Sequence, residues 1–196
     1  AMAATVQTTA GTVAVGTGRD PGGEGSERRL VRIDGTPQRG QARLAGVAGV
    51  VWLTPQMDRL FLESAGGRRR FVDRLVYGFD AEPATRVAAY EHALRERGRL
   101  LRERAGDRAW FQALEEQIAG QGVAIAAARR ELAIAIDQAA AEGVGPFPRP
   151  ALAMAGAVEA WLDEMPALAA EERLREALAA GRRGDAESGS AGIGPH

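Results

Sequence analysis

The sequence predicts an α+β protein in which a β-rich N-terminal part precedes an antiparallel pair of long helices, a coiled-coil-like hairpin. Over residues 1–62, short runs containing valine and threonine alternate with turn residues. Beyond them apolar residues recur with the period of an α-helix. The two longest helical stretches are separated only by residues 104–107, and so short a connection makes helices run antiparallel. We therefore divide the chain into residues 1–62, 63–147 and 148–196.

The composition excludes several kinds of site. The chain has 196 residues, of which 45% are hydrophobic and 26% charged, as in ordinary globular proteins. It has no cysteine and only two histidines, so we expect neither a disulfide nor a metal site. All 25 basic residues are arginine, and without a lysine the chain cannot carry a standard P-loop. It has no apolar run long enough to span a bilayer and no signal-peptide pattern, so we expect no membrane association and a cytoplasmic location.

The β-rich part contains three predicted strand regions. Residues 4–8 and 12–16 form a predicted hairpin, because a turn signal separates two β-prone runs. Residues 28–33 alternate in polarity and end at Asp34-Gly35, a dipeptide typical of two-residue hairpin turns. Residues 44–53 are almost continuously apolar, which predicts a buried strand.

The helical pair is predicted at about residues 84–104 and from Asp107 to about residue 142. Asp107 is a natural N-cap for the second helix. Gly120 and Gly122 interrupt that helix, so a kink is expected there. Aromatic residues Tyr90 and Trp110 also fall on the apolar stripes. The residues predicted to meet in the hairpin core are Leu94, Leu101, Leu114, Ile118 and Ile125.

The last part of the chain begins with a segment that cannot be helical. Residues 143–150 are rich in glycine and proline and predict an extended crossing. A short strand is expected at residues 151–154, followed by a helix over residues 158–180 with a break near Pro166. Residues 181–196 contain much glycine and serine and are expected to form a polar tail.

An arginine-rich helix is the clearest candidate site. Arg68, Arg69 and Arg70 open an amphipathic helix over residues 68–79, whose apolar stripe includes Phe71, Val72, Leu75 and Val76. Arg69, Arg70, Asp73 and Arg74 fall on the opposite face. Guanidinium groups held in this way suit phosphate or carboxylate. The alternative is a solvated face in which Asp73 pairs with Arg69 at i,i+4.

Four motifs in this order are similar to those of the RecF family of DNA replication and repair proteins. They are residues 50–56, residues 67–74 (with the family's R-R-x-F-L-D pattern), residues 90–97 and residues 194–196. Gln56 and Gly98 depart from the family's usual residues, an acid and an asparagine. The resemblance covers nearly the whole chain.

The resemblance implies an SMC-like ABC-type ATPase acting in DNA damage repair and the SOS response, including recombinase loading at gaps. Residues 1–62 would then be part of ATPase lobe I, residues 63–147 an inserted helical arm, and residues 148–196 a return toward lobe II. The longer protein would use ATP and Mg²⁺, bind single-stranded and duplex DNA, act with RecR-like and RecO-like mediators and form homodimers. This chain lacks the Walker A, signature and Walker B motifs, so we expect it to bind no nucleotide and to be non-catalytic alone.

The resemblance also suggests roles for individual residues. Arg68, Arg69, Arg70 and Arg74 would bind DNA phosphate, or else brace the arm against the head through Asp73 and nearby carboxylates. Gln56 would lie near the metal and the γ-phosphate, unless it is a plain turn residue. Two other functions stay open: a stand-alone helical module that binds a partner protein, and an unrecognised enzyme, for which no catalytic set stands out.

Overall fold

The computed structural model of the chain divides into two compact units, and we describe each by itself. The sheet unit comprises residues 1–58 and 77–82, and the helical unit comprises residues 59–76 and 83–196. The structure describes the backbone of residues 1–19, 29–38, 42–47, 54–62, 64–79, 82–143, 145 and 148–195. The side chains of Ala42, Ala45, Gln56, Asp58, Phe79 and residues 82–84 lie outside this description.

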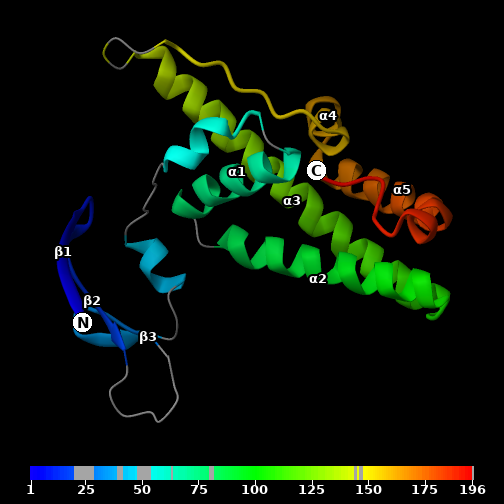
Figure 1. Cartoon of the computed structure of the whole chain (residues 1–196), viewed down its shortest axis with the longest axis horizontal. Helices are drawn as coiled ribbons and strands as arrows, with labels where there is room; N and C mark the ends of the chain where they lie inside the picture. The colour runs from blue at the N-terminus through cyan, green and yellow to red at the C-terminus, as the bar shows by residue number, and fades with distance from the viewer. Residues whose placement is uncertain are drawn as a thin grey trace. The chain divides into compact units, whose positions relative to one another are not determined.

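The sheet unit contains a four-stranded antiparallel meander in the order β1-β2-β3-β4 (Figure 1). The strands are β1 (Met2–Thr8), β2 (Gly11–Arg19), β3 (Arg29–Ile33) and β4 (Thr36–Gln38). In the register, Val6 lies opposite Val13 and Val15 lies opposite Ile33. The predicted first hairpin and the predicted third strand are therefore present.

The turn between β3 and β4 follows from its two residues. Asp34 and Gly35 both have positive φ angles, 48° and 76°, the left-handed conformation of tight hairpin turns. The Asp34 carboxylate also accepts a hydrogen bond from the backbone N–H of Ala14 at 2.8 Å, which ties the turn to β2. Val31 on β3 is 2% exposed.

The predicted buried strand at residues 44–53 is wrong where the structure describes it. Ala42–Gly46 form a 3-10 helix, η1, and residues 48–53 lie outside the described residues. A second 3-10 helix, η2, spans Pro55–Arg59. An apolar run alone does not distinguish a strand from a short helical segment, and the glycines at 46 and 49 weaken any strand.

The described part of the helical unit contains five α-helices, of which the third is much the longest (Figure 1). The helices are α1 (Ala65–Phe79), α2 (Glu82–Glu103), α3 (Arg108–Ala141), α4 (Ala157–Glu164) and α5 (Ala167–Ser188). α5 continues through residues 181–188, which the sequence placed in a polar tail. It ends at Gly189, whose φ of 77° is typical of a helix C-cap.

Helices α2 and α3 pair in the predicted antiparallel sense. The side chain of Asp107 caps α3 by accepting a hydrogen bond from the Trp110 N–H at 2.7 Å. Arg97 of α2 contacts Glu115 of α3. Tyr90, nearer the start of α2, packs against Gly122, nearer the end of α3, so the two helices run in opposite directions. Trp110 was expected in the core but is 49% exposed, because it lies in the first turn of α3 where few residues can cover it.

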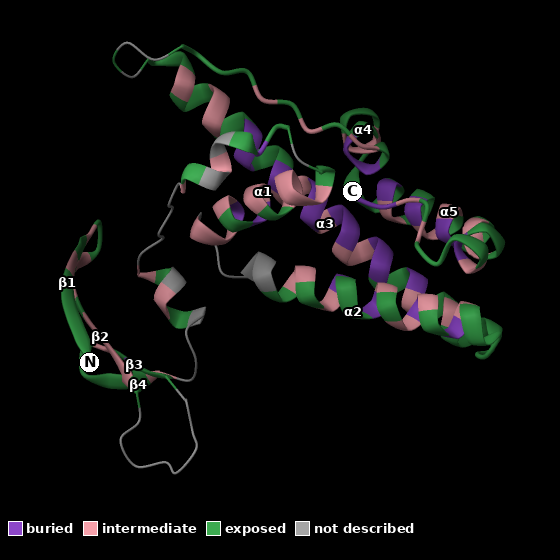
Figure 2. Cartoon of the chain, viewed as in Figure 1, coloured by how far each residue is buried: buried purple, intermediate pink, exposed green. Residues whose placement is uncertain are grey.

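The core is shared by four helices rather than two. Ile118 and Ile125 are buried as predicted, and Leu94 and Leu114 pack partly buried against them. Leu101 is only half-buried, whereas its neighbour Leu100 is 2% exposed. Val158 of α4 and the α5 residues Ala170, Leu174 and Leu178 complete the core, so residues 148–196 share it with α2 and α3 (Figure 2). No strand forms at residues 151–154.

The two mid-helix glycines of α3 have different surroundings, which predicts opposite effects of alanine. A Cβ at Gly122 would lie 3.2 Å from both Leu174 and Tyr90, which are buried and cannot easily move. At Gly120 the nearest atom, a Glu171 carboxylate oxygen, is 3.9 Å away. We expect Gly120→Ala to stabilise the protein by about 1 kcal/mol through helix propensity.

For Gly122→Ala we expect a net loss of stability, since overpacking costs about 1–3 kcal/mol and outweighs the gain in propensity. Thermal melts of the two variants measure this difference. A higher melting temperature for Gly122→Ala would mean that the core at Leu174 has room to spare.

Candidate nucleic-acid interface

The arginine-rich helix begins earlier than predicted, at Ala65 rather than Arg68. The Ser64 hydroxyl and carbonyl both accept from the Gly67 N–H, at 3.4 and 3.0 Å, which satisfies a donor of the first turn. The first turn of α1 contains no acidic residue. Val76, on the apolar stripe, is 8% exposed, so this side of the helix is covered by the rest of the protein.

The structure separates the four predicted arginines into three environments. Arg69 and Arg70 line one pocket together with Arg129, and we call it the arginine pocket. Arg68 borders an apolar groove of about 290 Å³ on another side of α1. The Arg74 guanidinium lies 5.9 Å from the centre of the Phe71 ring and is exposed. Of the four, Arg69 and Arg70 line the same pocket, and binding of DNA by the set stays a prediction.

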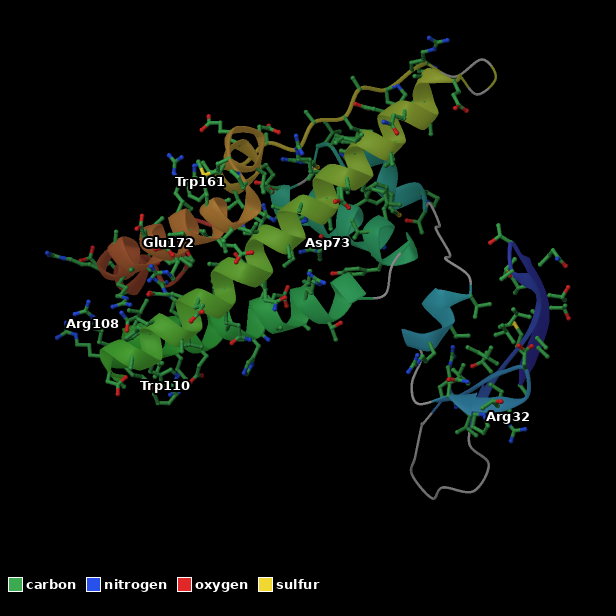
Figure 3. All side chains as sticks on the ribbon, turned by 180° about the vertical axis from the view of Figure 1, so that it is seen from behind. Arg32, Asp73, Arg108, Trp110, Trp161 and Glu172 are labelled. Atoms are coloured by element: carbon green, nitrogen blue, oxygen red, sulfur yellow. The ribbon has the colours of Figure 1, made fainter. Side chains whose placement is uncertain are left out.

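The carboxylate of the helix has a partner that the sequence did not suggest. Asp73 receives two hydrogen bonds from Arg129 of α3, from Nε at 2.8 Å and from Nη2 at 3.0 Å. Asp73 lies on α1 where that helix faces α3 (Figure 3). The expected i,i+4 pairing of Asp73 with Arg69 is wrong, because the bidentate geometry offered by Arg129 occupies both carboxylate oxygens.

Arg129 also reaches the end of the described chain. Its Nη1 donates a hydrogen bond to the carbonyl oxygen of Pro195 at 2.8 Å. Arg129 is 5% exposed, so one buried guanidinium joins α1, α3 and the Gly194-Pro195 segment. His196, the last residue of the predicted motif, lies outside the described residues.

The arginine pocket has a volume of about 250 Å³ and lies among α1, α2, α3 and the C-terminal segment. Burial raises the pKa of Tyr90 well above its ordinary value, although Arg129 and Arg69 act in the opposite direction. The hydroxyl of Tyr90 is buried and has no hydrogen-bond partner in the described part of the protein. The residues that line the pocket are Gly66, Arg69, Arg70, Asp73, Val87, Tyr90, Glu91, Leu94, Ile125, Arg129 and Pro195.

A second buried ion cluster joins α2, α3 and α5. Arg97, 1% exposed, donates to Glu115 at 3.1 Å, to Asp185 at 2.7 Å and to the Leu178 carbonyl at 2.6 Å. Arg182 makes two further bonds to the Glu115 carboxylate, at 2.8 and 2.5 Å. Arg97 therefore occupies a position on the buried face of α2 where an apolar residue would be usual.

This cluster positions the segment that follows α5. The Asp185 carboxylate accepts from the Gly192 N–H at 2.8 Å, while Arg129 holds Pro195 a few residues later. The segment is thus held at Gly192 and at Pro195 by buried charged side chains. Sequence reasoning missed Arg97, Arg129, Glu115 and Asp185, although each is in phase with an apolar helical stripe, which is the signal of a buried partnered charge.

Other predicted features lie away from the arginine pocket or are untested. The backbone of Gln56 is part of η2, but its side chain lies outside the described residues, so its role near a nucleotide stays a prediction. His92 is exposed on α2. Among the described residues no group of three or more His, Cys, Asp or Glu is arranged to hold a metal ion. No described helix is both long and apolar enough to cross a membrane.

Comparison with known proteins supports the resemblance found in the sequence. The chain is 45% identical over 190 residues to the DNA replication and repair protein RecF of Mesorhizobium japonicum, and 41% identical over 193 residues to RecF of Rhizobium meliloti. Each match covers 95% of this chain and about half of the relative, 49% and 50%. No protein-family model matches the chain.

The fold matches as well. A solved structure of the recombination mediator protein RecF-ATPrS in the RecFOR pathway superposes with a TM-score of 0.76 at 17% identity, covering 94% of this chain and 50% of the other. A structure of RecF-ATP from the same pathway gives 0.71 at 18% identity. These matches confirm the predicted resemblance and the mixture of helices with a small antiparallel sheet.

Proposed function

Since the chain is homologous over 95% of its length to the DNA replication and repair protein RecF, we propose that its helix α1 contacts the phosphate backbone of DNA. The chain spans about half the length of these relatives. The single observation that carries the proposal is the position of Arg69 and Arg70, on an anchored helix and without a carboxylate partner among the described residues.

The anchoring of α1 supports DNA contact over bracing for these two arginines. Asp73 is the carboxylate that would have engaged them, and both of its oxygens are bonded to Arg129. The guanidinium groups of Arg69 and Arg70 thus stay available on a helix that the Asp73–Arg129 pair holds in place. Binding of DNA irrespective of sequence needs only clustered positive charge on a firm scaffold.

The wider activity belongs to the longer protein. We infer that a RecF-like protein containing this chain binds ATP with Mg²⁺, dimerises and acts with RecR-like and RecO-like partners in loading a recombinase at gaps. The names of the solved relatives, RecF-ATPrS and RecF-ATP, support the ATP part of this proposal. A helical module that only binds partner proteins is the alternative, and it predicts no affinity for DNA.

Alanine at Arg70 or Arg74 is expected to weaken binding of DNA to a similar degree for every DNA sequence. Each change removes about one phosphate contact, so the slope of log affinity against log salt should flatten by about 0.9 on duplex DNA. Fluorescence anisotropy with a labelled duplex at several salt concentrations measures this slope.

A matched control is Arg183→Ala, which removes an exposed arginine of α5 whose side chain is 93% accessible and paired with Glu187. Its slope should equal that of the unaltered chain. If Arg70→Ala and Arg74→Ala instead lower the melting temperature and leave the slope unchanged, the arginines brace α1 and DNA is bound elsewhere.

A further inference from the structure

The arginine pocket combines three guanidinium groups with few free negative charges. Arg69 and Arg70 of α1 and Arg129 of α3 all line it. Of its two carboxylates, Asp73 is bonded through both oxygens to Arg129, and Glu91 is paired with Arg95 at 3.4 Å. Positive charge therefore predominates at the wall of the pocket, where an anion can approach it.

Arg129 is held in place and has N–H groups that no described residue accepts from. A guanidinium has five N–H groups in a rigid fork. Three of those of Arg129 are used, two by Asp73 and one by the Pro195 carbonyl. Because the side chain is 5% exposed and held by these bonds, it stands in place before any ligand arrives.

Tyr90 adds a buried donor that the protein itself does not use. The residue is 6% exposed and lines the pocket, and its hydroxyl has no hydrogen-bond partner among the described residues. The hydroxyl keeps its proton near neutral pH, as tyrosine ordinarily does, and burial raises its pKa further, so toward an anion it acts as a donor. A buried donor without an acceptor costs free energy, which a ligand oxygen beside it would recover.

The N-terminal end of α1 adds to the positive charge at the arginine pocket. Gly66, in the first turn of α1, lines the pocket, and that turn carries no acidic residue. The N-terminal end of a helix of this length bears a partial positive charge and unpaired N–H groups. The side chains of Arg69 and Arg70 come from the next positions of the helix.

From these observations we propose that the arginine pocket binds a single phosphate group, held by Arg69, Arg70 and Arg129. Residues with donor groups line the pocket from α1, α2 and α3, an arrangement that suits a tetrahedral anion with several oxygens better than a planar carboxylate with two. The inference rests on the proposed contact with DNA, and it adds a defined subsite to that contact. The phosphate comes either from the 5′ end of a strand or from an internal phosphodiester.

Inorganic phosphate tests the pocket without any DNA. We expect phosphate to raise the melting temperature of the purified chain above that in chloride of equal ionic strength, with a dissociation constant measurable by calorimetry. Arg69→Gln and Arg70→Gln should each weaken phosphate binding about tenfold, the loss of one charge-assisted hydrogen bond. Arg183→Gln is the control, and it should leave phosphate affinity unchanged, because the exposed Arg183 does not line the pocket.

Tyr90→Phe separates a ligand role from a structural one. The variant deletes an unsatisfied buried hydroxyl, so the phosphate-free protein should melt no lower than before. The rise in melting temperature that phosphate produces should nevertheless shrink. Equal stabilisation by phosphate in Tyr90→Phe, Arg70→Gln and Arg183→Gln would overturn the proposal, as would no phosphate effect beyond that of chloride.

Oligonucleotides of one sequence, with and without a 5′-phosphate, identify the source. Tighter binding of the phosphorylated strand, abolished in Arg70→Gln, assigns the pocket to a strand end. Equal affinities that both fall in Arg70→Gln assign it to the backbone. Binding of DNA by a chain that does not respond to phosphate would refute the pocket and leave the proposed function standing, whereas a phosphate response without DNA affinity would refute only the proposed function.

Discussion

Replacing Arg97 by methionine is expected to lower the free energy of unfolding by about 3–5 kcal/mol. The change fills most of the same volume, so little of the loss comes from a cavity. It does remove the guanidinium that pairs with Asp185 and one of the two that pair with Glu115, and these carboxylates are 7% and 1% exposed. The Leu178 carbonyl also loses its donor. Asp185, left buried without a cationic partner, accounts for most of the expected magnitude, since Glu115 keeps its two bonds from Arg182.

Arg99, two positions along the same helix, is the control for Arg97. It pairs with Glu96 at 2.6 Å and with Glu103 at 2.7 Å, but its side chain is 46% exposed. Exposed pairs contribute little because water screens them, so Arg99→Met should leave the urea midpoint nearly unchanged. Urea titrations followed by circular dichroism compare the two variants. Equal losses would show that the geometry of the Arg97 cluster does not determine stability.

The second large effect is expected at Asp73. Asp73→Ala leaves Arg129 buried with no carboxylate, and we expect a loss of about 3–5 kcal/mol. Because this pair joins α1 to α3, the change should also release α1, which hydrogen exchange of its backbone amides detects as faster exchange. Any contact of α1 with DNA should weaken in parallel.

The neighbouring pair Arg130–Asp163 is the control for Asp73. It joins α3 to α4 at 2.7 Å, but the two side chains are 45% and 62% exposed. Asp163→Ala should therefore change neither stability nor amide exchange in α1 appreciably. Slow exchange in α1 after Asp73→Ala would mean that the apolar stripe alone holds the helix.

Most helices and hairpins were predictable from short stretches of sequence, because neighbouring residues determine turns, caps and helix periodicity. Asp34-Gly35 supplies the positive φ angles of its turn, and Asp107 caps α3 with its own side chain. The 3.6-residue apolar period located α2 and α3 within a few residues. The errors arose where local signals are ambiguous: the apolar run at 44–53, the predicted strand at 151–154 and the glycine-containing end of α5.

By itself the sequence determined the helices, the first hairpin and the resemblance to RecF, because periodicity, turn chemistry and motifs can be read along the chain. It also located the arginine-rich helix that carries the candidate site. Only the tertiary structure decided which charges pair, since Asp73 and Arg129 are 56 residues apart and Arg97 and Asp185 are 88 apart. A charged residue on an apolar stripe signals burial, but its partner depends on which helix packs against that stripe. The division of Arg68, Arg69, Arg70 and Arg74 among separate surroundings follows from the same packing.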